Sequence, residues 1–259
     1  MPSSLQTTIR DLHLRRGRER RGLALAEGVR LLEEALAAGV PVRGAAISPA
    51  LEATTRGQAL KAALARAGVR LETVTDRELS ALADTETPQG IVAVIEPRRW
   101  SWSDLAPSAT APVLVLAGVQ DPGNVGTILR TALGLGAAGV VALKGTAELH
   151  NPKVVRGSMG ALFRLPAIAA DEPALLAWAR ERGVELWVAE ADGIPLASAS
   201  GDRPSRPVAL VLGNEGAGVP PDLAAQAARR VAIRLAPGVE SLNVATAAAI
   251  LLYEVTRDG

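Results

Sequence analysis

Short apolar segments alternate with amphipathic stretches along the first hundred residues, which is the pattern of an α/β protein. The apolar segments predict strands at 23–28, 42–49, 70–75 and 90–96. The stretches between them predict helices at 29–38, 57–67 and 77–85. Gly39 and Gly68 follow the first two helices as C-terminal stops, and Asp76 precedes the third as its expected N-cap.

The alternation restarts at Pro112 as a longer α/β unit. Its apolar runs predict strands at 113–119, 139–145, 185–191, 208–213 and 230–236. Its amphipathic stretches predict helices at about 125–135, 173–182 (capped by Asp171), 221–229 and 241–257, where Ser241 is the expected cap. Because these strands are apolar throughout and separated by helices, they predict a mostly parallel sheet covered on both faces.

The segment between the two halves, "PRRWSWSDLAPSATAP", is rich in proline and serine and has no periodicity, which is typical of a linker. We therefore expect a small α/β domain over residues 1–96, a linker over 97–111 and a larger α/β domain over 112–259.

Composition narrows the class of protein. The chain has 259 residues, of which 48% are hydrophobic but only 2% aromatic, so its cores are built from Ala, Leu and Val. The absence of cysteine excludes disulfides and cysteine-based metal sites. No apolar run is long enough to cross a bilayer, and the first residues lack the apolar stretch of a signal peptide. We expect a cytoplasmic protein with no membrane partner and no metal.

The formal net charge of +1 conceals a basic cluster at the N-terminus, where arginines between residues 10 and 21 face only Asp11 and Glu19. An arginine-rich arm on a near-neutral chain is a common footprint of nucleic-acid binding. A frayed, solvated terminus is the alternative. The candidate RNA-contacting residues are Arg15, Arg16, Arg18, Arg20 and Arg21.

Candidate chemistry is expected in the loops that leave the predicted parallel strands, because ligands bind outside the carboxyl ends of such strands. Three loops contain polar residues: "DPGNVG" from Asp121, "LVLGNEGAGVPPD" from Leu210, and "IRLAPGVESLNV" from Ile233. Taken singly, their polar residues could be helix caps, turn residues or solvated side chains. The chain has neither a Gly-x-Gly-x-x-Gly run after the first strand of this half nor a P-loop lysine, which weighs against a small-molecule enzyme of the nucleotide-binding type.

Taken together and in this order, the three loops resemble the signature motifs of the SpoU-type (SPOUT superfamily) RNA ribose 2'-O-methyltransferases. The matching runs are Asn124-x-Gly126-x-x-x-Arg130, Gly213-Asn214-Glu215-Gly216, and Ser241-Leu242-Asn243-Val244 with the alanine-rich helix after it. The segment "NPKVVRGSMGALFRLP" also resembles a segment that this family carries between its first two motifs. The first half, through "ERRGLALAEGVRLLEEAL" and "DTETPQGIVAVIEP", resembles the small L30e-like substrate-binding domain of the ribosomal-RNA branch. The loop "LAPGVES" departs from the family, where this stretch is longer.

The resemblance implies a deep trefoil knot in the second domain, with S-adenosylmethionine bound in it. It also implies a homodimer whose active sites are built from both chains, and methyl transfer to a ribose 2'-OH in RNA, with large-subunit ribosomal RNA as the expected substrate. A transfer-RNA methyltransferase of the same class and a non-catalytic RNA-binding assembly factor are the alternatives. The small apolar face of Ala245, Ala248 and Ala249 on the last helix is the expected dimer contact.

The same resemblance assigns roles to residues. Arg130 would stabilise the developing alkoxide and hold the neighbouring phosphate, because a guanidinium keeps its proton and cannot serve as the base. The expected catalytic residues are Arg130, Asn124, Glu215, Ser241 and Asn243. The expected cofactor-binding residues are Leu212, Gly213, Asn214, Gly216, Gly218, Ile233, Leu235 and Leu242.

Overall fold

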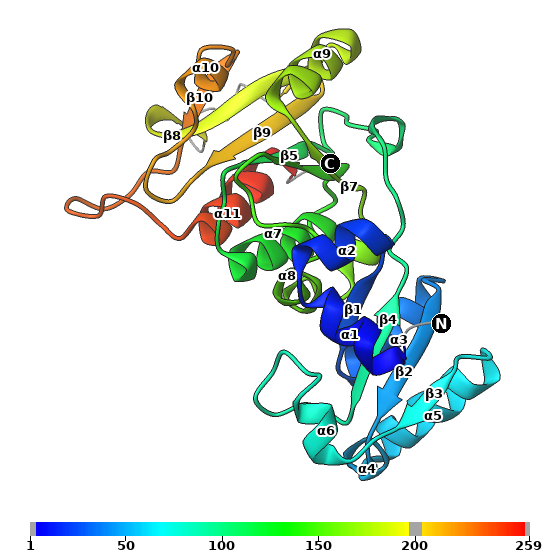
Figure 1. Cartoon of the computed structure of the whole chain (residues 1–259). Helices are drawn as coiled ribbons and strands as arrows, with labels where there is room; N and C mark the ends of the chain where they lie inside the picture. Colours follow the sequence, from blue (N-terminus) through cyan, green and yellow to red (C-terminus); the bar gives the residue numbers. More distant parts are fainter. Residues whose placement is uncertain (1–3, 197–203, 257–259) are drawn as a thin grey trace. The chain divides into compact units, whose positions relative to one another are not determined.

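The computed structural model describes residues 4–196 and 204–256 (Figure 1). The contacts within the chain divide it into two compact units. Unit 1 comprises Met1–Arg99 and His150–Phe163, and unit 2 comprises Trp100–Leu149 and Arg164–Gly259. The segment 150–163 lies within the second half of the sequence, yet its contacts place it in unit 1. None of the helices in the described ranges is long and apolar enough to cross a membrane.

Unit 1 is built on a four-stranded mixed sheet in the order β1-β4-β2-β3. The strands are β1 (Ala24–Glu27), β2 (Val42–Ile47), β3 (Leu71–Thr73) and β4 (Ile91–Ile95). Strand β4 pairs antiparallel with β1 and β2, whereas β3 pairs parallel with β2. The helices that connect these strands are α3 (Val29–Ala37), α4 (Pro49–Glu52), α5 (Thr55–Arg66) and α6 (Asp76–Ser80). All four predicted strands and all three predicted helices are therefore present.

The cap of α6 differs from the prediction by one residue. Thr75, not Asp76, is the N-cap: its hydroxyl accepts a hydrogen bond from the Glu78 amide at 3.2 Å, and the Glu78 carboxylate accepts one from the Thr75 amide at 2.8 Å. This reciprocal capping satisfies two amides at once. The hydrogen bonds from Thr75 lower the pKa of the Glu78 carboxyl.

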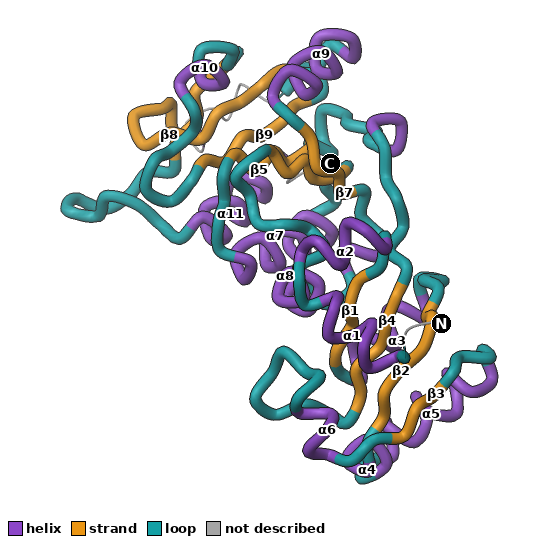
Figure 2. Tube along the Cα trace, viewed as in Figure 1, coloured by secondary structure: helices purple, strands orange, loops and turns teal. Residues whose placement is uncertain are grey.

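The basic N-terminus is folded rather than frayed. It forms α1 (Leu5–Leu12) and α2 (Arg15–Arg21), drawn as helical tube in Figure 2. Ile9 and Leu12 are fully buried and belong to the core of unit 1 with Leu25 and Val94. No helix was predicted here from the sequence, although the spacing of Leu5, Ile9 and Leu12 is typical of an amphipathic helix.

Unit 2 is built on six strands in the order β10-β8-β9-β5-β6-β7, and every neighbouring pair is parallel, as predicted. The strands are β5 (Val113–Ala117), β6 (Gly139–Leu143), β7 (Ala167–Ala170), β8 (Glu185–Pro195), β9 (Val208–Gly213) and β10 (Arg229–Ala232). Strand β7 was not among the predicted strands, because four residues after a proline carry little periodic signal.

Helices cover both faces of this sheet (Figure 1). The helices of unit 2 are α7 (Pro122–Gly134), α9 (Glu172–Arg182), α10 (Pro221–Ala224) and α11 (Val244–Thr256), with a short 3-10 turn at Trp102–Asp104. Leu175 and Trp178 of α9 and Leu223 of α10 share one core with Val115 and Val211 of the central strands. Helices α7 and α11 pack against each other on the opposite face. Asp171 caps α9, as predicted.

Segment 150–163 adds helix α8 (Pro152–Gly157) and a 3-10 turn (Ala161–Phe163) to unit 1. Helix α8 packs on β1, and the Arg156 guanidinium lies 2.8 Å from the Asp84 carboxylate. Gly160 has φ +90° and lies so close to the Glu34 side chain that an added Cβ would come within 2.7 Å of it. The segment is therefore fitted to unit 1.

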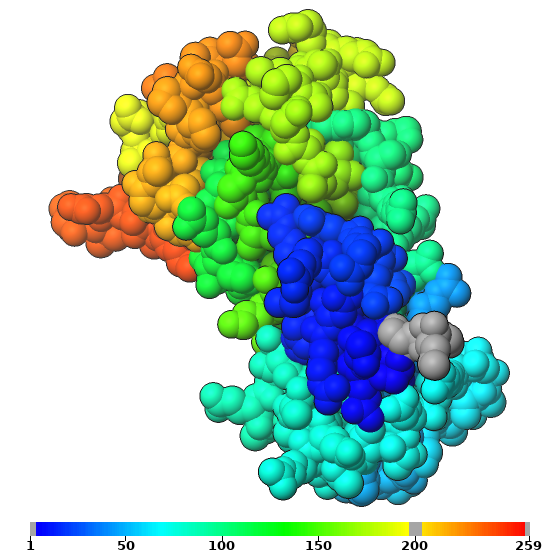
Figure 3. Space-filling model, in the orientation of Figure 1, coloured from blue at the N-terminus to red at the C-terminus, as the bar shows by residue number. Residues whose placement is uncertain are grey.

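The connection between β10 and α11 is long and exposed. Strand β10 ends at Ala232, earlier than predicted, and the residues from 236 to 243 are exposed and project from the surface of unit 2 (Figure 3). Helix α11 begins at Val244 with Asn243, not Ser241, in the capping position. The Asn243 Oδ1 accepts hydrogen bonds from the amides of Ala245 at 2.9 Å and Thr246 at 3.3 Å. An asparagine oxygen makes as good a cap as a serine hydroxyl.

Candidate functional site

Two of the three motif loops leave neighbouring strands at the same edge of the sheet. Strands β5 and β9 pair in parallel register, with Ala117 opposite Gly213, so their C-terminal loops start side by side. The third loop leaves β10 and returns to α11, which packs against α7. The topology thus brings three segments that are far apart in sequence to one edge.

The first loop is shaped by the cap of α7. The Asp121 Oδ1 accepts a hydrogen bond from the Asn124 amide at 2.7 Å, and Pro122 occupies the first turn. Proline suits this position because its missing N–H would have no partner there. The cap fixes where the helix begins and places the Asn124 side chain in the first turn.

The second loop is held by Asn214. Its Nδ2 donates to the Gly118 carbonyl at 2.9 Å, and its Oδ1 accepts from the amides of Gly216 and Ala217, both at 2.9 Å. The Asn214 side chain thus ties the β9 loop to the β5 loop and closes its own turn. An added Cβ at Gly213 would lie 2.3 Å from the Gly218 carbonyl carbon, so this close turn requires glycine.

Side chains from all three loops meet in one row of hydrogen bonds. The Asn243 Nδ2 donates to the Asn124 Oδ1 at 3.0 Å, and the Asn124 Nδ2 donates to the Glu215 Oε1 at 2.8 Å. Because Asn124 is both acceptor and donor, its amide has only one orientation that satisfies both neighbours. Three of the five predicted catalytic residues are therefore in direct contact, on three different loops.

Arg130 is outside this row. It lies six residues beyond Asn124 on α7, which turns it by about 120° from Asn124 around the helix axis. Its side chain is exposed and forms no ion pair or hydrogen bond with any residue in the described ranges. Ser241 is also outside the row and lies in the exposed connection before α11.

A cavity of about 170 Å³ opens beside the third loop, between the ends of β8 and β10 and helix α11. Three of the predicted cofactor-binding residues line it: Ile233, Leu235 and Leu242. Ser241 lines it as well. The remaining walls are mostly small and apolar, including Ala189, Ala191, Val231, Ala247 and Leu251.

The other predicted cofactor residues lie elsewhere on the edge. Leu212 is 2% exposed within β9, so its side chain belongs to the core. Asn214 and Gly218 line a second hollow of about 380 Å³, together with Gln120, Lys144 and Glu172. Gly213 and Gly216 line neither hollow. Of the eight predicted cofactor residues, three therefore line the 170 Å³ cavity, two line the second hollow and three line neither.

Glu190 lines the 170 Å³ cavity and was not singled out in the sequence. The ladder between β8 and β10 is interrupted there: Arg230 is opposite Val188, but the next residue, Val231, is opposite Ile194. Residues 189–193 therefore bulge out of the sheet. Gly193 lies inside the observed β8 but beyond its predicted end at residue 191, so the sequence pattern did not indicate the bulge.

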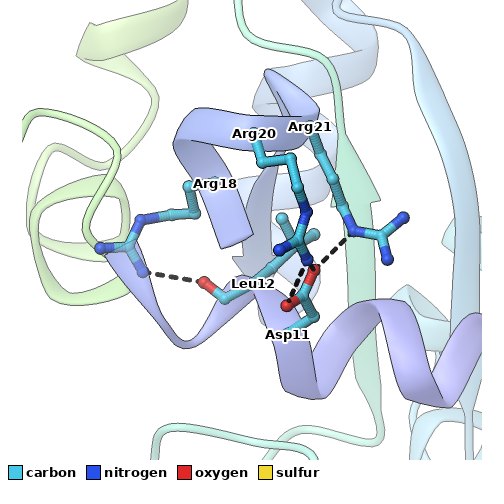
Figure 4. A network of polar contacts seen from close by, with 5 residues as sticks. All are labelled: Asp11, Leu12, Arg18, Arg20 and Arg21. Atoms are coloured by element: carbon cyan, nitrogen blue, oxygen red, sulfur yellow. Dashed lines mark hydrogen bonds and ion pairs between the residues drawn. The ribbon is translucent and has the colours of Figure 1, made fainter. Parts of the chain in front are cut away.

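Among the candidate RNA-contacting arginines, Arg18 is 5% exposed (Figure 4). Its Nη1 donates to the carbonyls of Leu12 at 2.8 Å and His13 at 2.9 Å, at the C-terminal end of α1. A guanidinium suits this position because the last carbonyls of a helix have no partners within it. Arg18 is therefore a structural residue, and it is not available to a phosphate.

Three more of these arginines are engaged in ion pairs. Asp11 accepts from the Arg20 Nη2 at 2.7 Å and from the Arg21 Nε at 2.6 Å (Figure 4). Hydrogen bonds from Arg21 and then Arg20 hold the pKa of the Asp11 carboxyl below its usual value. The Arg15 Nε lies 2.7 Å from the Glu19 carboxylate one turn later. Such exposed pairs are weak and can open for a ligand.

Unit 1 also has a hollow of about 160 Å³ that was not expected from the sequence. Its lining includes Arg30, Thr85, Gln89, Arg156 and Met159. The two guanidiniums come from segments more than a hundred residues apart, so no local pattern indicates it. Within residues 4–196 and 204–256, no cluster of three His, Asp or Glu side chains could hold a metal ion.

Comparison with known proteins assigns both halves of the chain. The profile of the SpoU rRNA Methylase family matches residues 111–253, and that of the MRM3-like substrate binding domain matches residues 7–93. The chain is 32% identical to the 23S rRNA (guanosine(2553)-2'-O)-methyltransferase RlmP of Bacillus subtilis, over 95% of this chain and 93% of that one.

Two solved structures with bound AdoMet have the same fold. An rRNA methyltransferase from Sinorhizobium meliloti superposes with a TM-score of 0.85 and 30% identity, covering 98% of this chain and 96% of the other. The SpoU methyltransferase AviRb from Streptomyces viridochromogenes superposes with a TM-score of 0.85 and 27% identity, covering 98% of each chain. With the motif loops, the parallel sheet and a profile match over more than half its length, the chain belongs to the SpoU rRNA methylase family.

Proposed function

We infer that this protein transfers the methyl group of S-adenosylmethionine to a ribose 2'-hydroxyl of large-subunit ribosomal RNA. The observation that carries the inference is the row Asn243–Asn124–Glu215, in which three motif loops converge at one edge of the sheet. These three side chains do not belong to the hydrophobic core, because Glu215 is exposed and Asn124 and Asn243 lie at the starts of helices. Relatives that methylate ribosomal RNA match nearly the whole chain.

The residues around the 170 Å³ cavity fit S-adenosylmethionine. Ile233, Leu235 and Leu242 offer apolar walls for a purine. When bound, the cofactor supplies a sulfonium-activated methyl group, so no metal is needed as electrophile. We assign the cofactor to this cavity.

The protein's own task is to orient the ribose and to stabilise charge on its 2'-oxygen. Asn124 is fixed by its two hydrogen bonds and can position the ribose through its remaining lone pair and N–H. Arg130 supplies the positive charge for the developing alkoxide and for the adjoining phosphate. A phosphate oxygen or a water molecule beside Arg130 takes the proton, because a guanidinium does not lose its own at neutral pH.

We propose that Arg130 serves the site of a second copy of this chain. On its own chain it is unpaired among the described residues and is turned about 120° from Asn124. Exposed apolar side chains lie on α7, the helix that carries Arg130, and on α11, which packs against it. Leu133 on α7 is 38% exposed, and Ile250 and Tyr253 on α11 are 37% and 53% exposed. Such a patch suits a homodimer.

This proposed dimer face differs from the one predicted from the sequence. Ala245 and Ala248 are 5% and 0% exposed and pack within their own chain, so the face of Ala245, Ala248 and Ala249 is not free for a partner. The small residues let α11 approach α7 and β9 instead. The outward face of α11 carries Ile250 and Tyr253.

Unit 1 is proposed to bind the RNA and choose its site. The matching profile describes a substrate binding domain, and the hollow with Arg30 and Arg156 offers donors for phosphate or base oxygens. Among the basic residues of α1 and α2, Arg10 and Arg16 are exposed and are the first candidates for phosphate contacts. We also propose that the C-terminal segment of unit 2 forms the family's trefoil knot, and that the protein acts in the cytoplasm.

Methyl transfer tests the main inference. The full chain would be incubated with S-adenosyl-[methyl-³H]methionine and unmodified 23S ribosomal RNA, and the RNA then hydrolysed with alkali. A 2'-O-methyl group blocks cleavage at its own position, so label in an alkali-stable dinucleotide is expected. Label in single nucleotides, or only in transfer RNA offered in parallel, would overturn the assignment.

Mixing two inactive variants tests the shared site. If Arg130 acts across the dimer, an Arg130→Ala/Asn243→Ala heterodimer has one doubly altered site and one intact site. Activity should then return to about half of wild type per heterodimer. If each chain carries its own complete site, both sites of the heterodimer stay altered and no activity returns.

A further inference from the structure

The bulge in β8 changes the lining of the cofactor cavity. Residues 189–193 depart from the ladder with β10, and Ala189, Glu190 and Ala191 all line the cavity as a result. In a regular strand successive side chains point to opposite faces, so three consecutive residues could not all face one cavity. Bulges of this kind turn a side chain toward a site.

The bulge is fixed by a close backbone approach. An added Cβ at Gly193 would lie 2.7 Å from the Val231 carbonyl carbon and 2.9 Å from that of Arg230. Only glycine lets the returning end of the bulge lie against β10. The position of Glu190 on the cavity wall therefore follows from the backbone and not from a flexible loop.

Glu190 is held in place by one of its two oxygens. Its Oε2 lies 3.2 Å from the Arg230 Nη1, while the Glu190 side chain is 21% exposed and that of Arg230 is 54% exposed. A half-exposed pair of this kind contributes little to stability. It does orient the carboxylate, and no other hydrogen bond or ion pair engages Glu190 among the described residues.

We propose that Glu190 accepts hydrogen bonds from the ribose hydroxyls of bound S-adenosylmethionine and so orients the cofactor. The proposal rests on the assignment of the cofactor to this cavity. A vicinal diol presents two O–H donors at the spacing of the two carboxylate oxygens, which is why acidic residues bind nucleoside riboses in other folds. The small apolar walls around Glu190 leave the carboxylate as a fixed polar anchor.

Glu240, the other acidic residue on the cavity wall, is a weaker candidate. It lies in the exposed connection before α11, and no residue in the described ranges holds its carboxylate. A freely moving carboxylate loses side-chain entropy on binding, whereas Glu190 is already positioned. Asp192 is on the same bulge, exposed and outside the cavity lining, and it provides a matched control.

Binding of three ligands by calorimetry tests the proposal with the full-length protein. S-adenosylmethionine, S-adenosylhomocysteine and 5'-methylthioadenosine share the ribose, but the second lacks the sulfonium charge and the third also lacks the amino-acid group. Glu190→Ala should weaken all three by the same factor, about ten- to a hundredfold for a lost hydrogen bond to a charged group. Asp192→Asn should leave all three unchanged.

A cycle with a deoxy ligand makes the assignment specific to the ribose. Wild type should bind 3'-deoxy-5'-methylthioadenosine more weakly than 5'-methylthioadenosine, and the Glu190→Ala variant should show little difference between them. If the variant weakens S-adenosylmethionine alone, Glu190 serves the cationic part and the proposal is wrong. If the affinities of the variant are all those of wild type, Glu190 does not contact the cofactor. Failure of the wild-type protein to bind any of these ligands would instead refute the cofactor assignment itself.

Discussion

The amide of Asn124 can be tested by a change of a single group. Asn124→Asp keeps the size of the side chain and the oxygen that accepts from Asn243, but it replaces the NH₂ that donates to Glu215 with a second oxygen. The variant therefore loses one hydrogen bond to a charged acceptor and gains two like charges in contact. The rest of the loop, including the cap from Asp121 to the residue-124 amide, is untouched.

The size of the effect follows from the separation of the two groups. Two carboxylates at the observed 2.8 Å repel by about 1.5 kcal/mol in bulk water and by about 6 kcal/mol at an effective dielectric constant of 20. Because Glu215 is exposed, the lower figure applies. The lost charge-assisted hydrogen bond adds about 1.5 kcal/mol, the low end of its usual range. The sum, about 3 kcal/mol, corresponds to a loss in kcat of roughly a hundredfold.

The direction of the pH dependence distinguishes charge repulsion between residue 124 and Glu215 from a general distortion of the loop. Like-charge repulsion raises the pKa of the introduced carboxyl above its usual value. Below that pKa the introduced carboxyl is protonated, donates to Glu215 and restores the row; above it, the row is lost. The ratio of the variant's kcat to that of wild type should therefore rise as pH falls from 8 to 5.

Asn124→Ala is the control, because it lacks the titrating group and its ratio to wild type should stay low at every pH. Single-turnover methyl transfer to 23S ribosomal RNA, with RNA and cofactor saturating, measures both ratios. A ratio for Asn124→Asp that is independent of pH, or that stays within threefold of unity at pH 8, would show that the contact with Glu215 does not order the site.

Other changes separate the remaining roles. Arg130→Ala should lower kcat by roughly 10²–10³ and leave the Kd of S-adenosylmethionine unchanged in calorimetry; retention of more than a few per cent of activity would contradict its role at the 2'-oxygen. Arg18→Ala should lower the free energy of unfolding of unit 1 by about 2–4 kcal/mol in urea melts, because two carbonyls lose a charged donor. Arg16→Ala should leave that melt unchanged and reduce the salt slope of RNA binding by about 0.7–0.9, and an unchanged slope would remove Arg16 from the RNA surface. Tyr253→Asp should convert the dimer to monomers in sedimentation equilibrium, since the side chain is 53% exposed on the proposed face; a stable dimer would place the interface elsewhere. The lowered pKa of Asp11 stabilises the fold above the unfolded-state pKa, and this contribution is lost as pH falls through the lowered value. Asp11→Asn should make acid unfolding below pH 4 less steep by circular dichroism, and an equally steep transition would show that the pair does not stabilise the native state.

Where periodicity and caps were strong, the sequence predicted the fold well. The apolar runs of β5, β6, β8 and β9 lie where the pattern placed them, because strands buried on both faces are apolar throughout. Strand β10 was predicted too long, since "IRLA" continues the apolar pattern but lies beyond the ladder with β8. A strand ends where its neighbour no longer pairs with it, and the sequence of β10 does not show where its pairing with β8 ends.

The sequence predicted which residues form the site but not which of them hydrogen-bond to one another. Asn124, Glu215 and Asn243 were identified from motifs, yet the order in which they bond depends on the register of β5 and β9 and on the packing of α7 with α11. The arginines show the opposite limit. The charge pattern gives no reason to distinguish Arg16 from Arg18. In the structure Arg16 is exposed, whereas Arg18 is buried and donates to the Leu12 carbonyl at the end of α1.

The placement of segment 150–163 has a consequence for how the chain is made. Arg156 pairs with Asp84 and α8 packs on β1, so unit 1 is finished only when residues well beyond Arg99 have left the ribosome. At translation speeds of about 5–20 residues per second, the N-terminal sheet waits several seconds for its last helix. During that interval β5 and β6 are synthesised while the face of β1 that α8 covers stays open to solvent. A truncated chain that stops at the linker would remain in that unfinished state permanently.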